Sequence, residues 1–551
     1  MRCSRVIPGG RLTLFRLGIA ISGPVLAAAF APGAAAQEPS TRITIDAAAD
    51  VHPINPQIYG VAFAATADLV ALNAPLNRMG GNSMTDYNWA LNAENLAADW
   101  YFESYPQQSA VPGAQADTLI SDSKDAGAEP MLTVPLIGWV ANLGSGRSIL
   151  PSFSVAKYGQ QCATDPYDPD AGDGVETDCS TFVVGNDPLD AYVKDNPDRE
   201  QKWIRHLIRT WGKAGHGGVG YYLMDNEASI WFSTHRDVHP IGPHAIEYRD
   251  KVIAESAKIK AADAGALVVA PEEWGWDGYF YSGYDQQYAA DHGYNRHPDR
   301  RKEQGGMDYI PWLLTEWKAS GKPVDVVSVH FYPQGGEYSN DVSTQMQLLR
   351  NRSTRQLWDR HYVSESWIDK PVYLIPRLKK WIAAEYYSGT PVALTEYNWG
   401  AEAYINGATT QADIYGIFGR EGLDMATRWA VPDSSTPTYK AMQMYRNYDG
   451  ADSTFGDNSV SATVPDPDDL SAFAALRSSD GAMTVMVIDK VLTGSTPVRL
   501  TLANFTQSGS ATVYRLTSSN VIQQLANVSW SKGVLTDTEP AQSITLYVLP
   551  D

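Results

Sequence analysis

The sequence predicts an α/β fold in which a (β/α)8 TIM-like barrel is followed by a C-terminal antiparallel β-sandwich. Between about residues 53 and 440, short apolar or β-branched runs alternate with helix-like stretches. This alternation favours a parallel sheet with helices outside it, and eight such runs are the number that closes a barrel. After about residue 441 the apolar residues alternate at period two, which is typical of antiparallel strands.

The runs predict the barrel strands in chain order. They span residues 58–63, 77–80, 131–135, 220–224, 267–270, 324–329, 392–394 and 423–426. The stretches between them predict crossover helices, among them 199–214, 245–264 and 376–387. In the first of these helices, Trp203 and Leu207 share one face, as expected for a helix that packs on a sheet. The stretch 140–197 is too long for an ordinary connection, so we expect a loop excursion at the mouth of the barrel.

The domain boundaries follow from the same patterns. We predict a signal peptide at 1–36, an N-terminal segment at 37–52, the barrel at 53–440 and the sandwich at 441–551. The N-terminal segment contains the alternating string TRITID, which we expect to add a strand to the sandwich. The other predicted sandwich strands span 472–477, 483–489, 498–503, 511–516 and 543–549.

The first 36 residues have the pattern of a secretion signal. Four arginines precede an apolar, Ala-rich stretch at 17–30, and Ala34-Ala35-Ala36 forms a small-residue cleavage site. The apolar stretch is too short for a membrane-spanning helix. We therefore expect a protein that is secreted, or retained in the periplasm, with no membrane attachment after cleavage.

The composition restricts the partners. The formal net charge of -20, from 43 Lys+Arg and 63 Asp+Glu, makes nucleic-acid binding improbable because the surface repels phosphate. The 16 Trp and 30 Tyr residues either fill the core or provide rings that stack on sugars, and both interpretations stay open for any single Trp. We expect a monomer that needs no cofactor for catalysis.

Signal cleavage removes Cys3 and leaves Cys162 and Cys179 in a compartment that permits disulfides, so we predict that these two are bonded. The loop between them is rich in Asp, Gly and Pro. It is either a solvated, turn-rich loop or a site for a structural Ca²⁺, which prefers oxygen ligands. The candidate calcium ligands are Asp165, Asp168, Asp170 and Asp173.

Two run ends carry glutamates that suit glycoside hydrolysis. The fourth run, YYLMDNE, ends in Glu227, and the seventh, PVALTEYNWG, contains Glu396. Chemistry in a barrel lies at the C-terminal ends of the strands, and glycoside hydrolysis needs two carboxyl groups that flank the scissile bond. Either glutamate alone would be better explained as a helix cap or as a partner of Arg78. Asn226 is placed to hydrogen-bond a sugar 2-hydroxyl.

Other run ends supply candidate substrate-binding residues. Tyr332 is placed to donate to the nucleophile, and Arg78 to lower the pKa of that carboxyl. The remaining candidates are Asn82, Trp139, Trp231, Trp274, Trp276, His330, Trp399 and Trp429.

Six strings together resemble one known family. RMGGNSMTDYNW, ADWYFESYP, DNEASIWFSTHRDVHP, APEEWGWDGYF, SVHFYPQGGEY and ALTEYNWGAE look like glycoside hydrolase family 44, which contains secreted bacterial endo-β-1,4-glucanases that often favour xyloglucan. The resemblance implies a retaining, double-displacement enzyme with Glu227 as acid/base and Glu396 as nucleophile. Its expected substrate is a β-glucan such as xyloglucan or soluble cellulose-type glucan, cleaved at internal β-1,4 bonds.

Alternative functions differ in how well the residues fit them. An endo-β-mannanase or xylanase would use the same two glutamates, so the pair does not separate them from a glucanase. A non-catalytic polysaccharide-binding protein would not need the pair. A zinc hydrolase is disfavoured because Arg236 follows His235 in HRDVH, where the zinc-protease motif has Glu. No G-x-S-x-G string indicates a serine hydrolase.

Overall fold

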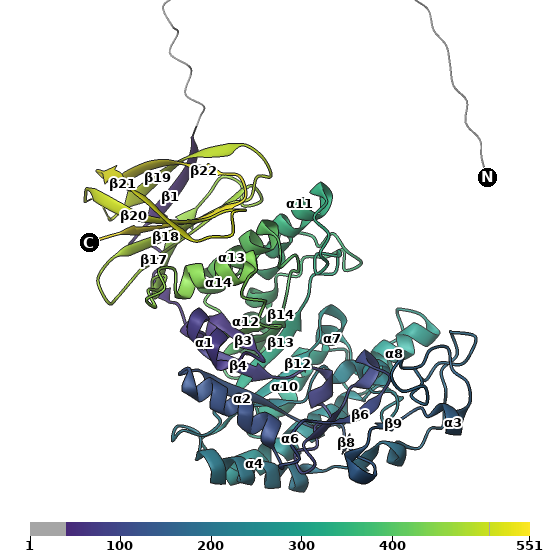
Figure 1. Cartoon of the computed structure of the whole chain (residues 1–551). Coiled ribbons are helices and arrows are strands. Elements are labelled where there is room, and N and C mark those ends of the chain that lie inside the picture. The colour runs from purple at the N-terminus through teal and green to yellow at the C-terminus, as the bar shows by residue number, and fades with distance from the viewer. Residues whose placement is uncertain (1–39, 506) are drawn as a thin grey trace, which may run out of the picture. The chain divides into compact units, whose positions relative to one another are not determined.

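The computed structural model describes residues 40–505 and 507–551, so the predicted signal peptide lies outside the described residues. Its largest part is a closed barrel of parallel strands, which confirms the predicted barrel (Figure 1). Each predicted run overlaps one strand. In chain order the strands are β3 (Gly60–Ala62), β4 (Leu76–Met79), β7 (Glu129–Val134), β11 (Tyr221–Met224), β12 (Leu267–Glu273), β13 (Val326–Phe331), β14 (Val392–Tyr397) and β15 (Met425–Arg428).

The barrel interior is filled by side chains. One buried cluster takes a single residue from each of seven barrel strands and none from a helix: Leu76, Met131, Leu223, Val269, Val326, Ala393 and Met425. The remaining strand, β3, contributes Gly60, where a Cβ atom would lie 2.6 Å from the carbonyl oxygen of Ala426. Glycine therefore lets β3 approach its neighbours closely enough to close the barrel.

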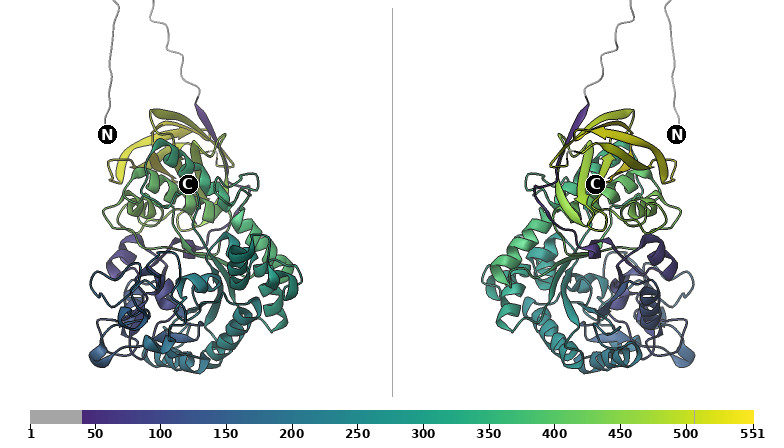
Figure 2. Two further views of the ribbon diagram at one scale, coloured as in Figure 1. Left: turned by 90° about the vertical axis from the view of Figure 1, so that its right-hand side faces the viewer. Right: turned by 90° about the vertical axis from the view of Figure 1, so that its left-hand side faces the viewer.

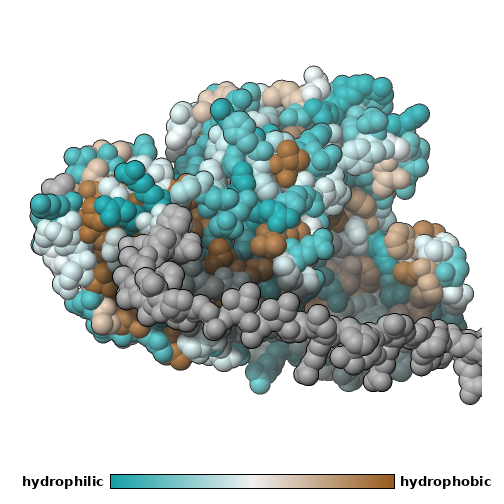
Figure 3. Space-filling view, turned by 90° about the horizontal axis from the view of Figure 1, so that it is seen from above, coloured by the Kyte–Doolittle hydropathy of each residue, from teal (hydrophilic) through white to brown (hydrophobic). Residues whose placement is uncertain are grey.

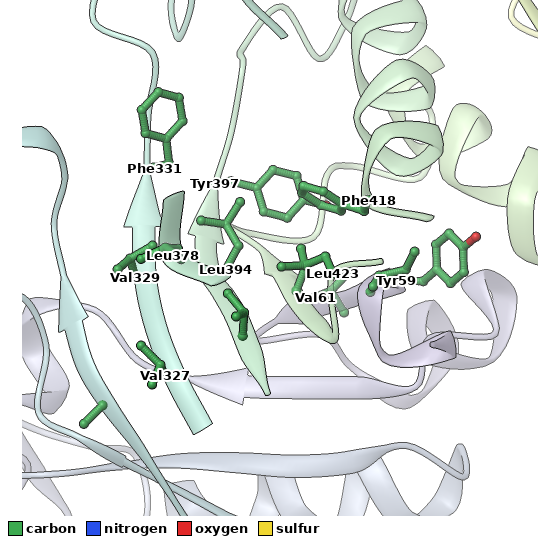
Figure 4. Close-up of a cluster of buried hydrophobic side chains, with 14 of the residues drawn as sticks. Tyr59, Val61, Val327, Val329, Phe331, Leu378, Leu394, Tyr397, Phe418 and Leu423 are labelled. Atoms are coloured by element: carbon green, nitrogen blue, oxygen red, sulfur yellow. The ribbon is translucent and has the colours of Figure 1, made fainter. Parts of the chain in front are cut away.

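Helices cover the outside of the barrel. Most are crossover helices between successive strands: α1 (Thr66–Leu72), α2 (Ala114–Asp125), α4 (Pro197–Trp211), α6 (Ala245–Ala262), α10 (Tyr309–Ala319), α12 (Leu374–Glu385) and α13 (Ile405–Arg420). The helix α14 (Pro437–Arg446) follows the last strand and contacts α13. Figure 4 shows how outward side chains of β13 and β14, such as Val329 and Leu394, lie beside Leu378 of α12 and Phe418 of α13. The outer core is thus a sheet-against-helix layer.

Long loops cover the C-terminal end of the strands. They hold short strands and helices: β5 (Ala93–Asn95), β6 (Glu103–Pro106), β8 (Trp139–Ala141), β9 (Leu150–Pro151), α3 (Val155–Tyr158), β10 (Tyr192–Lys194), α5 (Trp231–Thr234), α7 (Trp276–Phe280), α8 (Gly283–His292), α9 (Pro298–Lys302) and α11 (Thr344–Ser353). The stretch predicted as an excursion at 140–197 contains β9, α3 and β10, and β10 pairs with β8.

The second part is a sheet of ten strands in the order β1-β19-β22-β21-β20-β23-β18-β17-β16-β2. Its strands are β1 (Thr41–Asp46), β2 (His52–Pro53), β16 (Asn458–Thr463), β17 (Leu470–Leu476), β18 (Met483–Asp489), β19 (Ser495–Ala503), β20 (Gly509–Leu516), β21 (Gln523–Ser531), β22 (Val534–Pro540) and β23 (Ser543–Leu549). As predicted, the N-terminal strand β1 joins this sheet.

One pairing differs from the expected antiparallel pattern. β1 is antiparallel to β16 but parallel to β19, and it thereby links the two ends of the sheet. Its distance from β19 in the sequence means that no hairpin fixes its direction. The sequence analysis also predicts no strand at β21. The residues of this strand, QQLANVSWS, are mostly polar and exposed.

The sheet contacts the barrel through α13. This helix contacts β17, β18 and β23. Figure 2 shows the yellow strands of the sheet packed beside green helices of the barrel. Lys490, directly after β18, donates to Asp413 on α13 with an Nζ–Oδ2 distance of 2.7 Å, and both side chains are buried. The backbone carbonyl of Lys490 accepts a hydrogen bond from Asn351. Residues 40–551 accordingly form one compact unit, and the domain boundary predicted at 440 stays a prediction.

The face in Figure 3 is mostly hydrophilic, with hydrophobic residues in small groups. Among the described residues, no helix combines the length and apolar character that crossing a membrane requires.

The buried Lys490–Asp413 pair gives a stability prediction. Lys490→Met leaves the Asp413 carboxylate buried without its cation, so we expect a loss of about 3–5 kcal/mol in the free energy of unfolding. The double variant Lys490→Met/Asp413→Leu should recover most of that loss, because it removes both charges. Urea unfolding followed by fluorescence measures both. Lys532→Met, at an exposed position in the turn between β21 and β22, is the control, and a Lys490→Met variant as stable as this control would contradict the prediction.

Candidate active site

The two predicted glutamates meet at the C-terminal end of the barrel. Glu227 lies just after β11, the fourth strand, and Glu396 lies in β14, the seventh. His330 of β13 stands between them. One carboxylate oxygen of each glutamate and one ring nitrogen of His330 lie within 4.8 Å of one another. The barrel therefore brings together side chains that are 169 residues apart in numbering, from Glu227 to Glu396.

Glu396 is held by two donors. Arg78 of β4 donates from Nη1 to Oε1 at 2.6 Å, and the Tyr332 hydroxyl donates to Oε2 at 2.9 Å. Arg78 is fully buried, and its guanidinium places a positive charge beside the carboxylate. Charge-assisted hydrogen bonds of this kind are short and strong, so they fix the position of the carboxylate. The arrangement suits a carboxylate that must attack, and both predicted partners of Glu396 are in contact with it.

Glu227 has a different environment. Burial raises the pKa of Glu227 above its ordinary value, and the nearby charge of Glu396 adds to this effect, while His330 and Arg78 oppose it. Oε1 of Glu227 lies 2.8 Å from Nδ1 of His330. A buried carboxyl group with a raised pKa is suited to carry a proton near neutral pH.

His330 is a cation in this site. Burial disfavours its charged form, but Glu396, Glu227 and Glu272 outweigh burial and raise the pKa of His330 to about 10. Both ring nitrogens then donate, Nδ1 to Glu227 and Nε2 to Glu272 at 3.2 Å. His330 was predicted as a substrate-binding residue. The structure places it fully buried between the two glutamates, with Nδ1 2.8 Å from Glu227 and 3.6 Å from Glu396.

Glu272 is a site residue that the sequence analysis did not identify. It is fully buried near the end of β12 and accepts from Arg78 Nη2 at 3.1 Å and from Thr395 Oγ1 at 2.9 Å. Burial raises its pKa, but His330 and Arg78 outweigh burial and lower it. The site thus contains two cations and three carboxyl groups, and a proton on Glu227 makes it neutral. Only its place after the fifth run, in APEEWGWDGYF, could have indicated it.

The loop after β11 is fixed by Asp225. Its buried carboxylate accepts from Thr85 Oγ1 at 2.7 Å and from the backbone N–H groups of Leu136 and Ile137. Asp225 and Glu227 both have positive φ, 66° and 49°, a conformation that costs energy for residues other than glycine. The hydrogen bonds of Asp225 hold this strained turn, which aims Glu227 at the centre of the barrel.

Asn226 lies between the two strained residues and contacts the same network. Its Oδ1 accepts from Arg78 Nη2 and from the backbone N–H of Gly81, both at 3.2 Å, and its Nδ2 donates to Asn82 at 3.2 Å. Asn82 in turn donates to Asp99 at 3.0 Å. The predicted residues Asn226 and Asn82 therefore lie at the site, side by side.

The predicted tryptophans divide into two groups. Trp139, Trp274 and Trp429 are only partly buried. Trp429 belongs to the site, because the Arg78 guanidinium lies 5.7 Å from its ring centroid. Trp274 directly follows β12 and donates from Nε1 to Gln286.

Three other tryptophans are corrected. Trp231 and Trp399 are buried and donate to Asp225 and Ser353, so neither offers a ring face to a sugar. Trp276 is buried as well, against Phe280 and Arg377. Core packing, the alternative that stayed open for each Trp, applies to these three.

The sequence analysis did not name two exposed tryptophans among the candidates for sugar stacking. Trp100 and Trp367 have exposed fractions of 38% and 48%. Trp367 donates to Gln334, whose amide donates to the carbonyl of Tyr332, so this ring is tied to the segment beside Glu396. Neither lies at the end of a predicted strand, and for that reason the strand-end argument did not find them.

The disulfide between Cys162 and Cys179 is present, as predicted. The four aspartates of its loop make local hydrogen bonds. Asp170 accepts from Ser154 Oγ and the Ala156 N–H, and Asp173 accepts from two backbone N–H groups. Within the described residues, they are not among the groups of ligand atoms that lie within 4.8 Å of one another. The four-aspartate calcium site stays a prediction without geometric support.

Asp165 has a neighbour that the sequence analysis missed. Both carboxylate oxygens of Glu103 are buried, and within residues 40–505 and 507–551 neither has a hydrogen-bond partner. Burial, with the nearby charges of Asp165 and Asp168, raises the pKa of Glu103 to about 8. A buried carboxylate that lacks donors, such as Glu103, fits a hard cation such as Ca²⁺, whereas the oxygens of Asp165 accept from Trp100 Nε1 and the Tyr167 N–H. Glu103, with Asp165 beside it, is therefore the part of this loop region whose chemistry suits calcium.

The histidines of the disfavoured zinc motif do not share a site. His235 is fully buried, with Nδ1 3.3 Å from Asp86, and burial lowers its pKa. His239 contacts Glu247 at 3.0 Å. The two imidazoles serve separate local contacts.

Comparisons with known proteins identify the family of the chain. Residues 93–335 match glycoside hydrolase family 44. The crystal structure of CelM2, a bifunctional glucanase-xylanase from a metagenome library, superposes with a TM-score of 0.92 at 57% identity, over 93% of this chain and 100% of that one. A xyloglucanase of family 44 from Paenibacillus polymyxa superposes with a TM-score of 0.77 at 28% identity, over 93% and 99%.

A curated relative is longer. The beta-mannanase/endoglucanase A of Caldicellulosiruptor saccharolyticus is 27% identical over 518 residues, which are 87% of this chain and 36% of that protein. This chain thus spans about a third of that relative. The family match, the shared barrel and sheet, and the similarity to CelM2 over its full length agree with one another. The chain belongs to glycoside hydrolase family 44.

Proposed function

We propose that the protein is an endo-β-1,4-glucanase that hydrolyses internal bonds of xyloglucan and related soluble glucans with retention of configuration. The observation that carries the proposal is the unequal environment of two close carboxyl groups. Glu396 accepts from Arg78 and Tyr332, whereas Glu227 is buried with a raised pKa. Their oxygens, within 4.8 Å of each other, favour retention, for which carboxyl groups about 5–5.5 Å apart are typical.

In the first step the Glu396 carboxylate attacks the anomeric carbon. As the new C–O bond forms, the bond to the leaving sugar breaks, and Glu227 gives its proton to the leaving oxygen. Arg78 and Tyr332 hold the Glu396 carboxylate in position for the attack. His330, which is held between Glu227 and Glu272, leaves the second oxygen of Glu227 free to carry the proton.

In the second step Glu227 acts as a base. The ester formed on Glu396 has no charge, so the repulsion that helped to raise the pKa of Glu227 disappears. Glu227, now a carboxylate, takes a proton from water. The water oxygen bonds to the anomeric carbon, the bond to Glu396 breaks, and both glutamates return to their starting states.

The partly buried rings around the site support a neutral polysaccharide as substrate. Trp429, beside Arg78, and Trp274, directly after β12, offer apolar faces on which pyranose rings can stack. Trp139 lies on β8, with Lys194 Nζ 5.8 Å from its ring centroid. Xylan is a second candidate substrate, because the similar protein CelM2 is described as a glucanase-xylanase. Xyloglucan is the first substrate to test, because the similar protein from P. polymyxa is described as a family 44 xyloglucanase. We also propose secretion, on the basis of the pattern at 1–36.

The roles of the two glutamates can be separated by experiment. We expect Glu396→Gln and Glu227→Gln each to lower kcat/KM on xyloglucan by about 10²–10⁴-fold or more. With an aryl β-glycoside whose leaving group needs no protonation, Glu227→Gln should keep rapid release of the phenol and accumulate the glycosyl-enzyme, while Glu396→Gln should stay inactive. Stopped-flow absorbance and mass spectrometry measure the two effects.

Glu129→Gln, at an exposed position where β7 begins, is the matched control. Reversed behaviour of the two variants would mean that the roles are exchanged. NMR of the first-formed product gives its anomeric configuration. An inverted configuration would exclude the double-displacement mechanism.

The pH dependence tests the function of His330. The alkaline limb of kcat/KM should reflect loss of the Glu227 proton, because activity needs the protonated acid. His330 lowers the pKa of Glu227 through its hydrogen bond and charge, so His330→Gln should move this limb to higher pH. The exposed variant His361→Gln should not move it. A limb that stays in place in His330→Gln would show that another group controls it.

We further propose that Glu103 and Asp165 hold a structural Ca²⁺. The ion would neutralise two buried carboxylates and fasten the loop that contains the disulfide; it would take no part in bond cleavage. Added Ca²⁺ should raise the Tm of the protein by a few degrees over its value in EGTA. Glu103→Gln should abolish this shift, whereas Asp173→Asn should keep it. The opposite pattern would favour the ligands that the sequence suggested.

A further inference from the structure

The loop after β12 forms a hollow with an unusual charge. The hollow has a volume of about 730 Å³ and lies along α8 and α9. Four cationic side chains line it, Arg296, Arg300, Arg301 and Lys302, and its lining includes no Asp or Glu. The whole chain carries 20 more acidic than basic residues, so this concentration of positive charge runs against the composition.

Most of this charge is not neutralised within the protein. Arg300 pairs with Asp308 at 2.5 Å. Across residues 40–505 and 507–551, Arg296, Arg301 and Lys302 form neither an ion pair nor a side-chain hydrogen bond, and all three are exposed. Single exposed cations are common on protein surfaces. Three unpaired ones around a concave surface without carboxylates produce a local positive potential that attracts an anion.

The backbone that carries these cations is held by buried carboxylates. Asp285 of α8 accepts from the backbone N–H groups of Asp299 and Arg300, both at 2.8 Å. Asp299 in turn accepts from Ser282 Oγ at 2.8 Å and from the Ala245 N–H at 3.1 Å. These bonds fix the start of α9, so the cationic side chains project from a set backbone, which reduces the entropy lost on binding.

Aromatic side chains complete the hollow. Tyr284 and Tyr288 line it, and each is backed by a histidine: Tyr284 stacks on His244 and Tyr288 on His292, both with ring centroids 4.0 Å apart. Rigid, partly exposed rings beside cations suit a ligand that has both an apolar face and a carboxylate. The ring of a uronic acid within a polysaccharide has both features.

The hollow lies on the same loop excursion as part of the candidate active site. Glu272 is near the end of β12, Trp274 follows two residues later, and Trp274 donates to Gln286 of α8 at 3.2 Å. A polysaccharide bound at the carboxyl end of the barrel can therefore extend along this excursion. The strongly acidic chain as a whole disfavours nucleic acids, whose charge density is far higher than that of a polysaccharide with occasional uronic acids.

We propose that this hollow is a binding site for the uronic acid units of an acidic polysaccharide, such as a xylan that bears glucuronic acid branches. Arg296, Arg301 and Lys302 contact the carboxylate, and Tyr284 and Tyr288 contact the sugar rings. The site adds affinity for acidic chains and does not take part in the chemistry at Glu227 and Glu396.

The test compares one ligand with and without its charge. Glucuronoxylan and the same polymer after reduction of its carboxyl groups are offered to the protein in affinity electrophoresis, all in the Glu396→Gln background so that neither is consumed. We expect the unreduced polymer to bind about tenfold more tightly, equivalent to about 1.4 kcal/mol. Added salt should weaken this preference, since the cations are exposed.

The variant Arg296→Gln/Arg301→Gln/Lys302→Gln should lose the preference. Its matched control, Lys202→Gln/Arg205→Gln/Arg209→Gln, removes the same charge from exposed positions of α4 and should retain it. The proposal is overturned if both polymers bind equally, if the control loses the preference as well, or if oligo(dT) binds as tightly as glucuronoxylan. With Glu396 intact, both triple variants should hydrolyse neutral xyloglucan at the wild-type rate, so a failure of the proposed function would be seen separately.

Discussion

The buried guanidinium of Arg78 is the interaction on which the site depends. It contacts carboxyl groups from two strands, Glu396 of β14 and Glu272 of β12, and the amide of Asn226 after β11. Burying such a charge is costly unless charges and hydrogen bonds compensate it. The two carboxylates supply that compensation, so the cation and its partners form a single unit at the centre of the barrel.

This unit also explains why two similar glutamates differ. Arg78 and Tyr332 act directly on Glu396, whereas Glu227 contacts only His330 among the cations. Glu272 accepts hydrogen bonds from both Arg78 and His330. It therefore limits how strongly either cation can stabilise a charge on Glu227. A neutral site then needs one proton, and Glu227, with its raised pKa, is the group that best accommodates it. This charge balance supports the proposed roles of Glu227 as acid and Glu396 as nucleophile.

The rest of the fold holds Arg78 and its partners in place and surrounds them. Asp225 fixes the strained turn that presents Glu227, and helices outside the barrel bury the far side of each strand. The sheet of ten strands is joined to α13 by the buried Lys490–Asp413 pair, close in sequence to β14 and β15. The long loops are less constrained by the barrel, and they contain the disulfide loop, the exposed tryptophans and the cationic hollow.

Much of this could be read from the sequence, because it depends on local patterns. Apolar periodicity indicated each barrel strand, and the rule that barrel chemistry lies at strand ends was enough to select Glu227, Glu396, Arg78 and Tyr332. Polar strands such as β21 escaped this approach, since they bury little apolar surface and show no clear period.

The three-dimensional packing decided what depends on partners distant in the chain. Glu272 became a site residue only when folding placed it against Arg78, 194 positions away. Trp231, Trp399 and Trp276 look like Trp429 in the sequence, but burial removed them from the set of sugar-binding candidates. Glu103 meets Asp165 for the same reason. A side chain's protonation and exposure are set by its neighbours in space, and a linear pattern gives only its neighbours along the chain.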